Sequence, residues 1–221
     1  MRFLRNLKKN NDRDWFRERK DLYEQSVRHP MELLVSEAAV RCRQNGLPLH
    51  TKDRSPVMRV YRDIRFSDDK RPFKSHVGAS LRNTKTQFGE LYIHISPEEA
   101  FLAAGFWMPE RPFLQLWRQS MTENPQRFLK VEKSLQKAGL TLSHENRLTR
   151  LPRGFDAYAE SGVAEHLRLT SYVTTQALRP QDCTSPKLLE TVCAFALGAK
   201  PLLEYGWSLN YTPRRDILEE R

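Results

Sequence analysis

The spacing of apolar residues changes twice along this chain, and that change constrains the fold more than any other feature. Apolar side chains recur at helical spacing in residues 3–42 and again in residues 113–135. Between them, residues 57–96 alternate apolar and polar side chains, as strands with one buried face do. The connections are too short for helical crossovers, so antiparallel pairing is expected. The pattern predicts an α+β fold: an antiparallel sheet meander flanked by N-terminal and C-terminal helices, in a single compact domain over residues 1–221.

Three helices are expected within the first 46 residues. Residues 3–7 form a short apolar stripe, and Asp12 or Asp14 suits the N-cap of the helix that follows. Pro30 suits the first turn of a third helix, and Gly46 suits its end. Proline is tolerated at the first helical position, and glycine is favoured just past the last one.

Strands are predicted from alternation, from β-branched content or from a continuous apolar run. They cover residues 57–66, 76–82, 91–96, 100–108 and 169–178. Helical spacing returns after Pro109 and predicts helices over residues 112–121, 128–139 and 188–203. Trp107 and Trp117 are both expected in the core, because large aromatic side chains contribute most to buried apolar area.

The composition indicates one globular domain outside the membrane. A chain of 221 residues can bury a sizeable core without disulfides or a structural metal. No stretch approaches the ~20 apolar residues that a membrane helix needs. The three cysteines cannot all pair and form no C-x-x-C motif, so a reducing, cytoplasmic location is expected.

Positive charge is concentrated in the first part of the chain. The net charge is +10, and residues 1–90 carry 21 Lys and Arg against 12 Asp and Glu. Residues 91–221 carry 16 against 15. This asymmetry indicates an anionic partner, whether nucleic acid, a phosphorylated metabolite or a carboxylate. A solvated basic surface without a partner is the alternative interpretation.

The familiar catalytic signatures are absent from the sequence. There is no phosphate-binding G-x-x-x-x-G-K-[ST] loop, no G-x-G-x-x-G, no H-E-x-x-H and no G-x-S-x-G. The cysteines and histidines do not have the spacing of zinc ligands. The cofactor is therefore left open, and no metal is assigned.

The predicted strand over residues 57–66 carries an unusual polar face. Because side chains alternate along a strand, four polar residues share one side. They are Arg59, Tyr61, Asp63 and Arg65. The other side is apolar except for Arg62, which lies between Val60 and Ile64. An unpaired guanidinium in a core is too costly, so Arg62 is expected to pair with a buried carboxylate or to line a ligand cavity.

The neighbouring predicted strands add His76, Tyr92 and His94 to the same polar surface. Arginine suits planar recognition of carboxylate or phosphate, so this surface is the candidate ligand site. His76 and His94 are candidate catalytic acid–base groups, with Asp63 as a third catalytic candidate that orients one of them. A facial metal site of the same three residues is chemically conceivable. The alternative is a ladder of surface ion pairs.

Two loops extend the list of candidate ligand-binding residues. Lys70 and Lys74 lie in the turn-rich stretch 67–74, where they suit contact with an anion. Arg153 precedes Gly154, whose backbone freedom allows close approach to a ligand. The predicted ligand-binding set is Arg59, Tyr61, Arg62, Arg65, Lys70, Lys74, Tyr92 and Arg153.

The run from Tyr61 to His76, Y-R-D-I-R-F-S-D-D-K-R-P-F-K-S-H, resembles the signature of the bacterial and fungal DUF2461 family. That signature is roughly Y-R-D-x-R-F-S-x-D-K-x-P-Y-K-x-H, and Phe73 stands where tyrosine is usual. Further similar pieces lie at residues 3–16, near the start of the chain, and at residues 92–97, 105–109 and 151–156. The resemblance implies a compact α+β domain but no established reaction or cofactor.

Three functions remain in competition. The first is a site for a small molecule bearing phosphate or carboxylate, with acid–base catalysis by the histidines as an open question. The second is nucleic-acid binding by the basic first half, in which aromatic and charged residues interleave. The third is a structural or interaction domain without a ligand.

Overall fold

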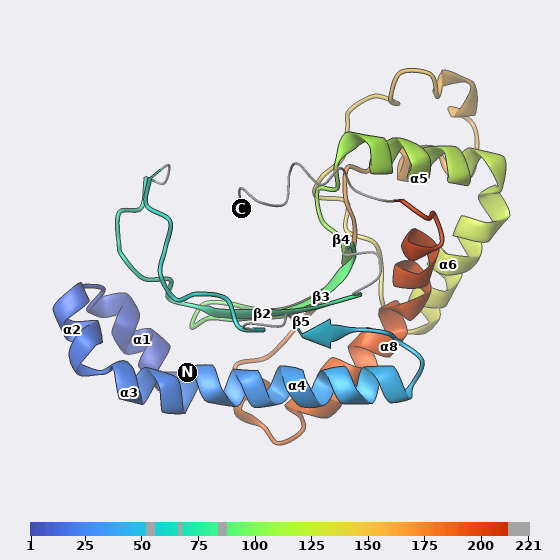
Figure 1. Ribbon diagram of the computed structural model, residues 1–221. Coiled ribbons are helices and arrows are strands. Elements are labelled where there is room, and N and C mark those ends of the chain that lie inside the picture. Colours follow the sequence, from blue (N-terminus) through green and yellow to red (C-terminus); the bar gives the residue numbers. More distant parts are fainter. Residues whose placement is uncertain (52–55, 66–67, 84–87, 212–221) are drawn as a thin grey trace.

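A five-stranded antiparallel sheet forms the centre of the computed structural model, which describes residues 1–51, 56–65, 68–83 and 88–211 (Figure 1). The strand order follows the chain, so the sheet is a meander. The strands are β1 (His50–Thr51), β2 (Val77–Arg82), β3 (Glu90–Ile95), β4 (Ala100–Phe106) and β5 (Tyr172–Ala177). The predicted α+β class and the antiparallel pairing are confirmed.

Helices precede the sheet, follow β4 and end the described chain. They are α1 (Arg2–Lys9), α2 (Arg13–Glu18), α3 (Lys20–Tyr23), α4 (His29–Gln44), α5 (Arg111–Glu123), α6 (Pro125–Lys137), α7 (Ala164–Leu167) and α8 (Leu188–Trp207). Short 3-10 turns lie at Asp156–Tyr158 and Asp182–Thr184. Figure 1 shows α4 and α8 beneath the sheet and α5 and α6 at one end of it.

The N-terminal helices follow the sequence prediction at their capping and first-turn residues. Asp12 caps α2, its carboxylate accepting a hydrogen bond from the Trp15 amide at 2.8 Å. Gly46 follows the end of α4 with φ of 70°, a conformation that favours glycine. Helices α3 and α4 are joined by a π-helical turn, Glu24–Arg28, and Pro30 lies in the first turn of α4, as predicted. The π-helical turn ends just before His29 and Pro30, and the proline has no amide hydrogen to donate to the preceding turn.

The lower face of the sheet is the main core. Its alternate side chains on β2, β3 and β4 are almost fully buried: Ala79, Leu81, Leu91, Ile93, Leu102 and Ala104. The apolar sides of α4 and α8 cover this face (Figure 1), with Val35, Ala38, Ala196 and Ala199 buried there. Sequence alternation predicted this face because every second residue of a strand points the same way.

Residues 57–65 do not form the predicted strand. Val57 makes one isolated bridge to Ala79 at the sheet edge, and Tyr61 makes another to Phe73. Further on, the Arg62 amide donates to the Pro72 carbonyl at 2.9 Å. The chain therefore leaves the sheet after Met58 and pairs with its own continuation, forming the arm that rises beside the sheet in Figure 1. We call residues 58–76 the basic hairpin. Residue 66, the end of the predicted strand, lies outside the described residues.

The expectation that both tryptophans are buried holds for only one of them. Trp117 on α5 is fully buried, whereas Trp107 is 57% exposed. Strand β4 ends at Phe106, and Met108 then adopts a positive φ of 40°, its amide donating to Ser171 Oγ at 2.8 Å. This turn sends Trp107 outward. A continuous apolar run at 100–108 could not reveal where the strand ends.

Two further features concern the cysteines and the length of the helices. Cys42, Cys183 and Cys193 are free thiols. Within the described ranges, no helix has the length and apolar character to cross a membrane.

Candidate functional site

The upper face of the sheet combines small, aromatic and polar residues in a regular grid. Directly paired residues share a face, so the strand register defines its rows. From β2 to β5 these are Gly78, His94, Phe101 and Ala177; then Ser80, Tyr92, Ala103 and Thr175; then Arg82, Glu90, Gly105 and Val173. Figure 1 shows the sheet curving so that this face is concave, between the basic hairpin and α5.

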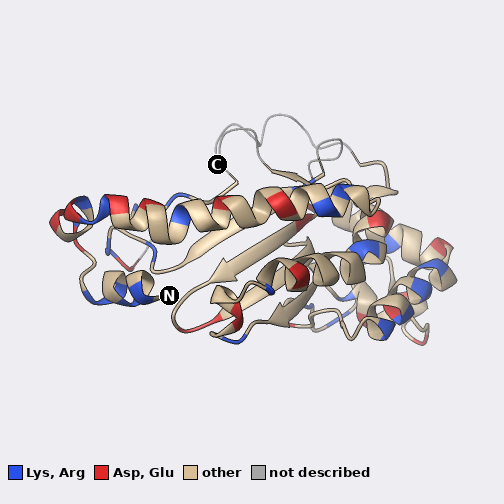
Figure 2. Ribbon diagram, turned by 90° about the horizontal axis from the view of Figure 1, so that it is seen from below, with Lys and Arg blue, Asp and Glu red and all other residues tan. Residues whose placement is uncertain are grey.

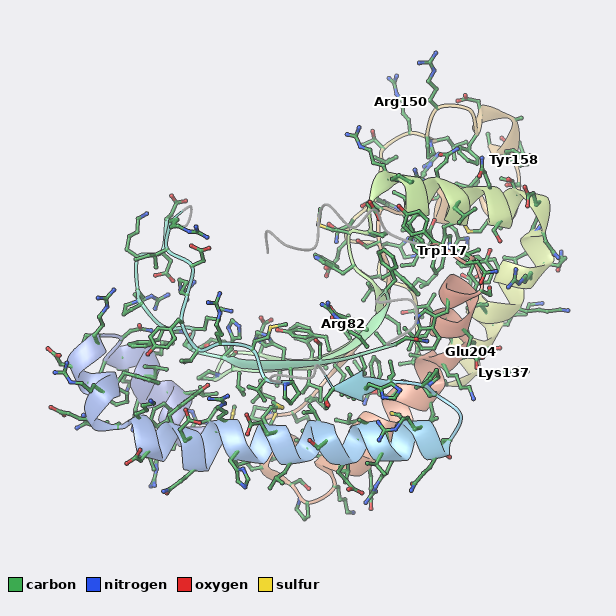
Figure 3. All side chains as sticks on the ribbon, viewed as in Figure 1. Arg82, Trp117, Lys137, Arg150, Tyr158 and Glu204 are labelled. Carbon is green, nitrogen blue, oxygen red and sulfur yellow. The ribbon has the colours of Figure 1, made fainter. Side chains whose placement is uncertain are left out.

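A hollow of about 620 Å³ lies on this concave face. Small residues from β4 and β5 form part of its lining, including Ala103, Gly105 and Thr175. Aromatic side chains and carboxylates complete much of the wall: Tyr92, Phe101, Trp107, Glu90, Glu99 and Glu145. Arg82, labelled in Figure 3, comes from the same face and pairs with Glu90 at 2.7 Å.

Two histidines lie against one another beside the hollow. The His76 and His94 ring centroids are 4.5 Å apart. His94 stacks on Phe101 at 4.8 Å between centroids, and its Nδ1 is 3.2 Å from the Tyr92 hydroxyl. Because Tyr92 and Phe101 line the hollow, the histidine pair adjoins its wall. The predicted meeting of His76, Tyr92 and His94 is present in the geometry.

Two cations of the basic hairpin, Lys74 and Arg62, lie beside His76, and Arg59 lies beside Lys74. Burial lowers the pKa of the Lys74 ammonium, and the charges of Arg59 and Arg62 lower it further. Burial also lowers the pKa of His76 to about 4, followed by the effects of His94, Lys74 and Arg62. We call Arg59, Arg62, Lys74 and His76 the cationic cluster. The imidazole of His76 is therefore uncharged at neutral pH.

The cationic cluster has few negative partners in the described part of the chain. Lys74 and His76 make no ion pair there, and Arg59 interacts with a carboxylate only weakly, through the field that helps to lower the pKa of Asp63. Arg62 Nη2 pairs with Asp69 Oδ2 at 3.2 Å, while its Nε is buried without a hydrogen-bond partner. Arg62 meets neither predicted outcome in full: its partner Asp69 is half-buried instead of buried, and Arg62 is not part of the hollow's described lining.

Asp63 and Arg65 satisfy one another away from the histidines. Arg65 donates from Nε and Nη2 to the Asp63 carboxylate at 3.1 and 2.8 Å, and both residues are exposed. These hydrogen bonds lower the pKa of Asp63 to about 2. No hydrogen bond or ion pair joins Asp63 to His76 or His94 within the described segments. Asp63 and Arg65 therefore form a surface ion pair. In the described structure Asp63 makes no contact that would orient either histidine.

Other predicted residues hold the hairpin or lie elsewhere. Tyr61 packs on Phe73 with ring centroids 5.3 Å apart, and Lys70 Nζ donates to the Ile64 carbonyl at 3.0 Å. Arg153 is exposed in the loop after Arg150, which Figure 3 places above α5, at the other end of the molecule from the basic hairpin. The position of Arg153 before Gly154 in the sequence could not indicate that Arg153 lies at the other end of the molecule.

A metal site is not supported by the described residues. Among them, no three His, Cys, Asp or Glu side chains are arranged to hold an ion. In the conceivable facial set, Asp63 is turned toward Arg65 instead of the histidines.

The family model described as conserved hypothetical protein DUF2461 matches residues 1–205. The chain belongs to the DUF2461 family. No curated protein and no solved structure matches the chain.

The DUF2461-like motifs noted in the sequence meet in space. Asn11, from the N-terminal motif, exchanges two 3.0 Å hydrogen bonds with the Phe73 backbone. Phe16 stacks on the Phe73 ring with centroids 4.2 Å apart. The first motif therefore anchors the hairpin that the second motif forms, and the hairpin in turn supplies Arg62, Lys74 and His76 to the cluster.

Sequence reasoning missed most of the hollow's lining in this DUF2461 chain. Phe101 could have been found, because a hairpin register that pairs residues 94 and 101 puts it beside His94. Trp107 carried no usable signal, since its exposure depends on the turn at Met108. Glu145 comes from a distant loop, and only tertiary structure brings it to β4 and β5.

Proposed function

We propose that this protein binds a small anionic molecule, bearing phosphate or carboxylate, at the cationic cluster beside the concave sheet face. The observation that carries the proposal is the grouping of Lys74 and Arg62 beside His76, with Arg59 beside Lys74 and with Asp69 as the only directly paired carboxylate of these cations among the described residues. Like charges held together in a partly buried place repel one another, and a bound anion relieves that repulsion.

The ion-pair alternative accounts for other arginines better than for this cluster. Arg65 pairs with Asp63, Arg71 with Asp69 and Arg179 with Asp182, each within 3 Å and close in sequence. The chain thus places a carboxylate beside an arginine at many surface positions. The half-buried Lys74 has no such carboxylate within the described ranges, which favours an external anion.

The neighbouring histidines suit acid–base chemistry on the bound molecule. Burial lowers the pKa of His94 as well, with Glu99 opposing the effect, so both imidazoles are neutral near pH 7. A neutral imidazole can accept a proton, and the Tyr92 hydroxyl at 3.2 Å from His94 Nδ1 can share one. In this proposal Tyr92 takes the orienting role first assigned to Asp63.

Binding of nucleic acid is less well supported. Along the N-terminal helices, Arg17 pairs with Asp14, Arg28 with Glu24 and Glu32, and Arg41 with Glu37. Figure 2 shows acidic and basic positions interspersed along the ribbon of α4 instead of a continuous basic stripe. A phosphate backbone needs an extended row of uncompensated cations.

Isothermal titration with inorganic phosphate and sulfate tests the proposal. The Lys74→Met variant should bind either anion roughly tenfold or more weakly, because a charge-assisted hydrogen bond contributes about 1.5–3 kcal/mol. Arg153→Gln is the matched control, since it removes an equally charged side chain remote from the cluster. Absence of binding by the parent protein, or equal losses in both variants, would contradict the proposal.

A further inference from the structure

The hollow next to the cationic cluster has the opposite electrostatic character. Every charged side chain in its described lining is a carboxylate: Glu90, Glu99 and Glu145. The cations of the basic hairpin are not part of that lining. A ligand that reaches from the cluster into the hollow therefore passes from a positive to a negative environment.

Two of these carboxylates lack a charged partner among the residues that the structure describes. Glu90 is neutralised by Arg82 at 2.7 Å. Glu99 Oε1 lies 3.8 Å from His94 Nε2, but burial lowers the pKa of that imidazole, so it is uncharged at neutral pH. The side chain of Glu145 is exposed and makes no ion pair within the described structure. The described lining of the hollow thus keeps net negative charge.

The wall between the carboxylates is aromatic. Tyr92 and Phe101 rise from the sheet, and the exposed Trp107 follows β4. Trp107 is held outside the core by the turn in which Met108 has a positive φ, a costly conformation for a residue with a side chain. Such strain is typical of functional positions. Aromatic faces attract cations electrostatically, most strongly where water is partly excluded.

We propose that this hollow binds a protonated amine or a quaternary ammonium group. The ammonium site itself does not depend on the proposed anion site. Its consequence, that the natural ligand is a zwitterion, does rest on the proposed function. Its anionic end contacts the cationic cluster, and its ammonium end lies among Tyr92, Phe101 and Trp107 with Glu99 and Glu145 nearby. A ligand with several anionic groups and no cation does not match the hollow.

Three probes separate the two halves of the site. They are 3-aminopropyl phosphate, propyl phosphate, which has the same three-carbon chain without the amine, and the propylammonium ion. By isothermal titration at pH 7, the parent protein should bind 3-aminopropyl phosphate roughly tenfold more tightly than propyl phosphate, from cation–π and ionic contacts together.

Two variants locate the effect. In the double variant Glu99→Gln with Glu145→Gln, the advantage of the amine should fall to about threefold or less, while the Kd for propyl phosphate stays unchanged. Trp107→Ala should also reduce the advantage. Glu160→Gln, which removes an exposed carboxylate in another loop, is the control and should behave like the parent.

The outcomes distinguish this inference from the proposed function. If propyl phosphate binds as tightly as 3-aminopropyl phosphate, the amine site is overturned and the anion site stands. If propylammonium binds through Glu99 and Glu145 while propyl phosphate does not bind, the anion site is overturned and the amine site stands. If none of the three probes binds, both are overturned.

Discussion

Arg118 and Arg62 are both largely withdrawn from solvent, yet their surroundings differ. Arg118 on α5 is only 7% exposed, and it donates from Nε to the Leu167 carbonyl at 2.9 Å and from Nη2 to the Leu169 carbonyl at 3.1 Å. These carbonyls lie at and just beyond the C-terminal end of α7, where backbone oxygens lack helical partners. Arg62, in the basic hairpin, has one ion pair and a buried Nε without a partner.

The difference separates a structural cation from one available to a ligand. Arg118 ties the segment around α7 to α5 through fixed backbone acceptors, so an added anion has nothing to satisfy there. Arg62 belongs to a group of cations that outnumber the carboxylates beside them. The degree to which donors and charges are already satisfied therefore distinguishes the two roles better than burial does.

The largest effect is expected for Arg118→Met. Removing the guanidinium leaves the two carbonyls without their donor, which should lower the free energy of unfolding by about 2–4 kcal/mol. Urea denaturation measures this loss. Sulfate affinity, measured where the variant remains folded, should be unchanged. A variant as stable as the parent would show that Arg118 does not hold the α7 segment.

Arg62→Ala should have the reverse profile. Asp69 keeps its ion pair with Arg71 at 2.6 Å, so the cost in stability should not exceed about 1 kcal/mol. Sulfate affinity should fall roughly tenfold, because a half-buried charged donor is lost. The same urea and calorimetric measurements apply to both variants. Destabilisation as large as that of Arg118→Met would make Arg62 a structural residue and remove the contrast.

A smaller, pH-dependent effect is expected for His76→Gln. Because the pKa of His76 is about 4 in the folded protein and near its ordinary value of 6.5 when unfolded, the unfolded state binds the extra proton first. The parent protein therefore loses stability as pH falls from about 6.5 to about 4. Between pH 8 and pH 5 the free energy of unfolding of the variant should therefore rise by about 1 kcal/mol relative to that of the parent, after allowance for partial solvent exposure.

The exposed His144 supplies the control for this measurement. His144→Gln should leave the difference in unfolding free energy between pH 5 and pH 8 unchanged. If His76→Gln also leaves it unchanged, the burial of His76 and the charges beside it do not lower the pKa of His76 in solution.

The smallest effect concerns sulfate affinity as a function of pH. A bound anion stabilises the imidazolium form of His76 and so raises its pKa. Binding then takes up a proton, and affinity should increase modestly, by about threefold, as pH falls from 7 to 5. Titrations of the parent and His76→Gln at both values check this, and the variant should show a weaker dependence.

Periodicity was sufficient for the parts of the fold that depend on local pattern. The alternation in β2 and β3 predicted the buried lower face and put Tyr92 and His94 together on the upper one. The short connections predicted antiparallel pairing, and Asp12 predicted the start of α2. These inferences succeed because faces, caps and tight turns depend on residues close together in the chain.

The same reasoning failed where a segment had more than one possible partner. Residues 57–65 have a strand-like pattern, but the pattern does not say whether they pair with the sheet or with residues 72–74. The structure selects the latter, with Asn11 and Phe16 holding Phe73 in place. The four polar residues of the predicted face consequently do not join the histidines as a group.

The sequence by itself determined the fold class, the face that carries Tyr92 and His94, the DUF2461 membership and the concentration of cations around the hairpin. Tertiary structure alone decided that Lys74 and Arg62 crowd His76, that Trp107 is exposed and that Arg153 lies elsewhere. The physical reason is the range of the interactions: side-chain direction follows from local backbone geometry, whereas charge balance and burial depend on neighbours brought together by folding.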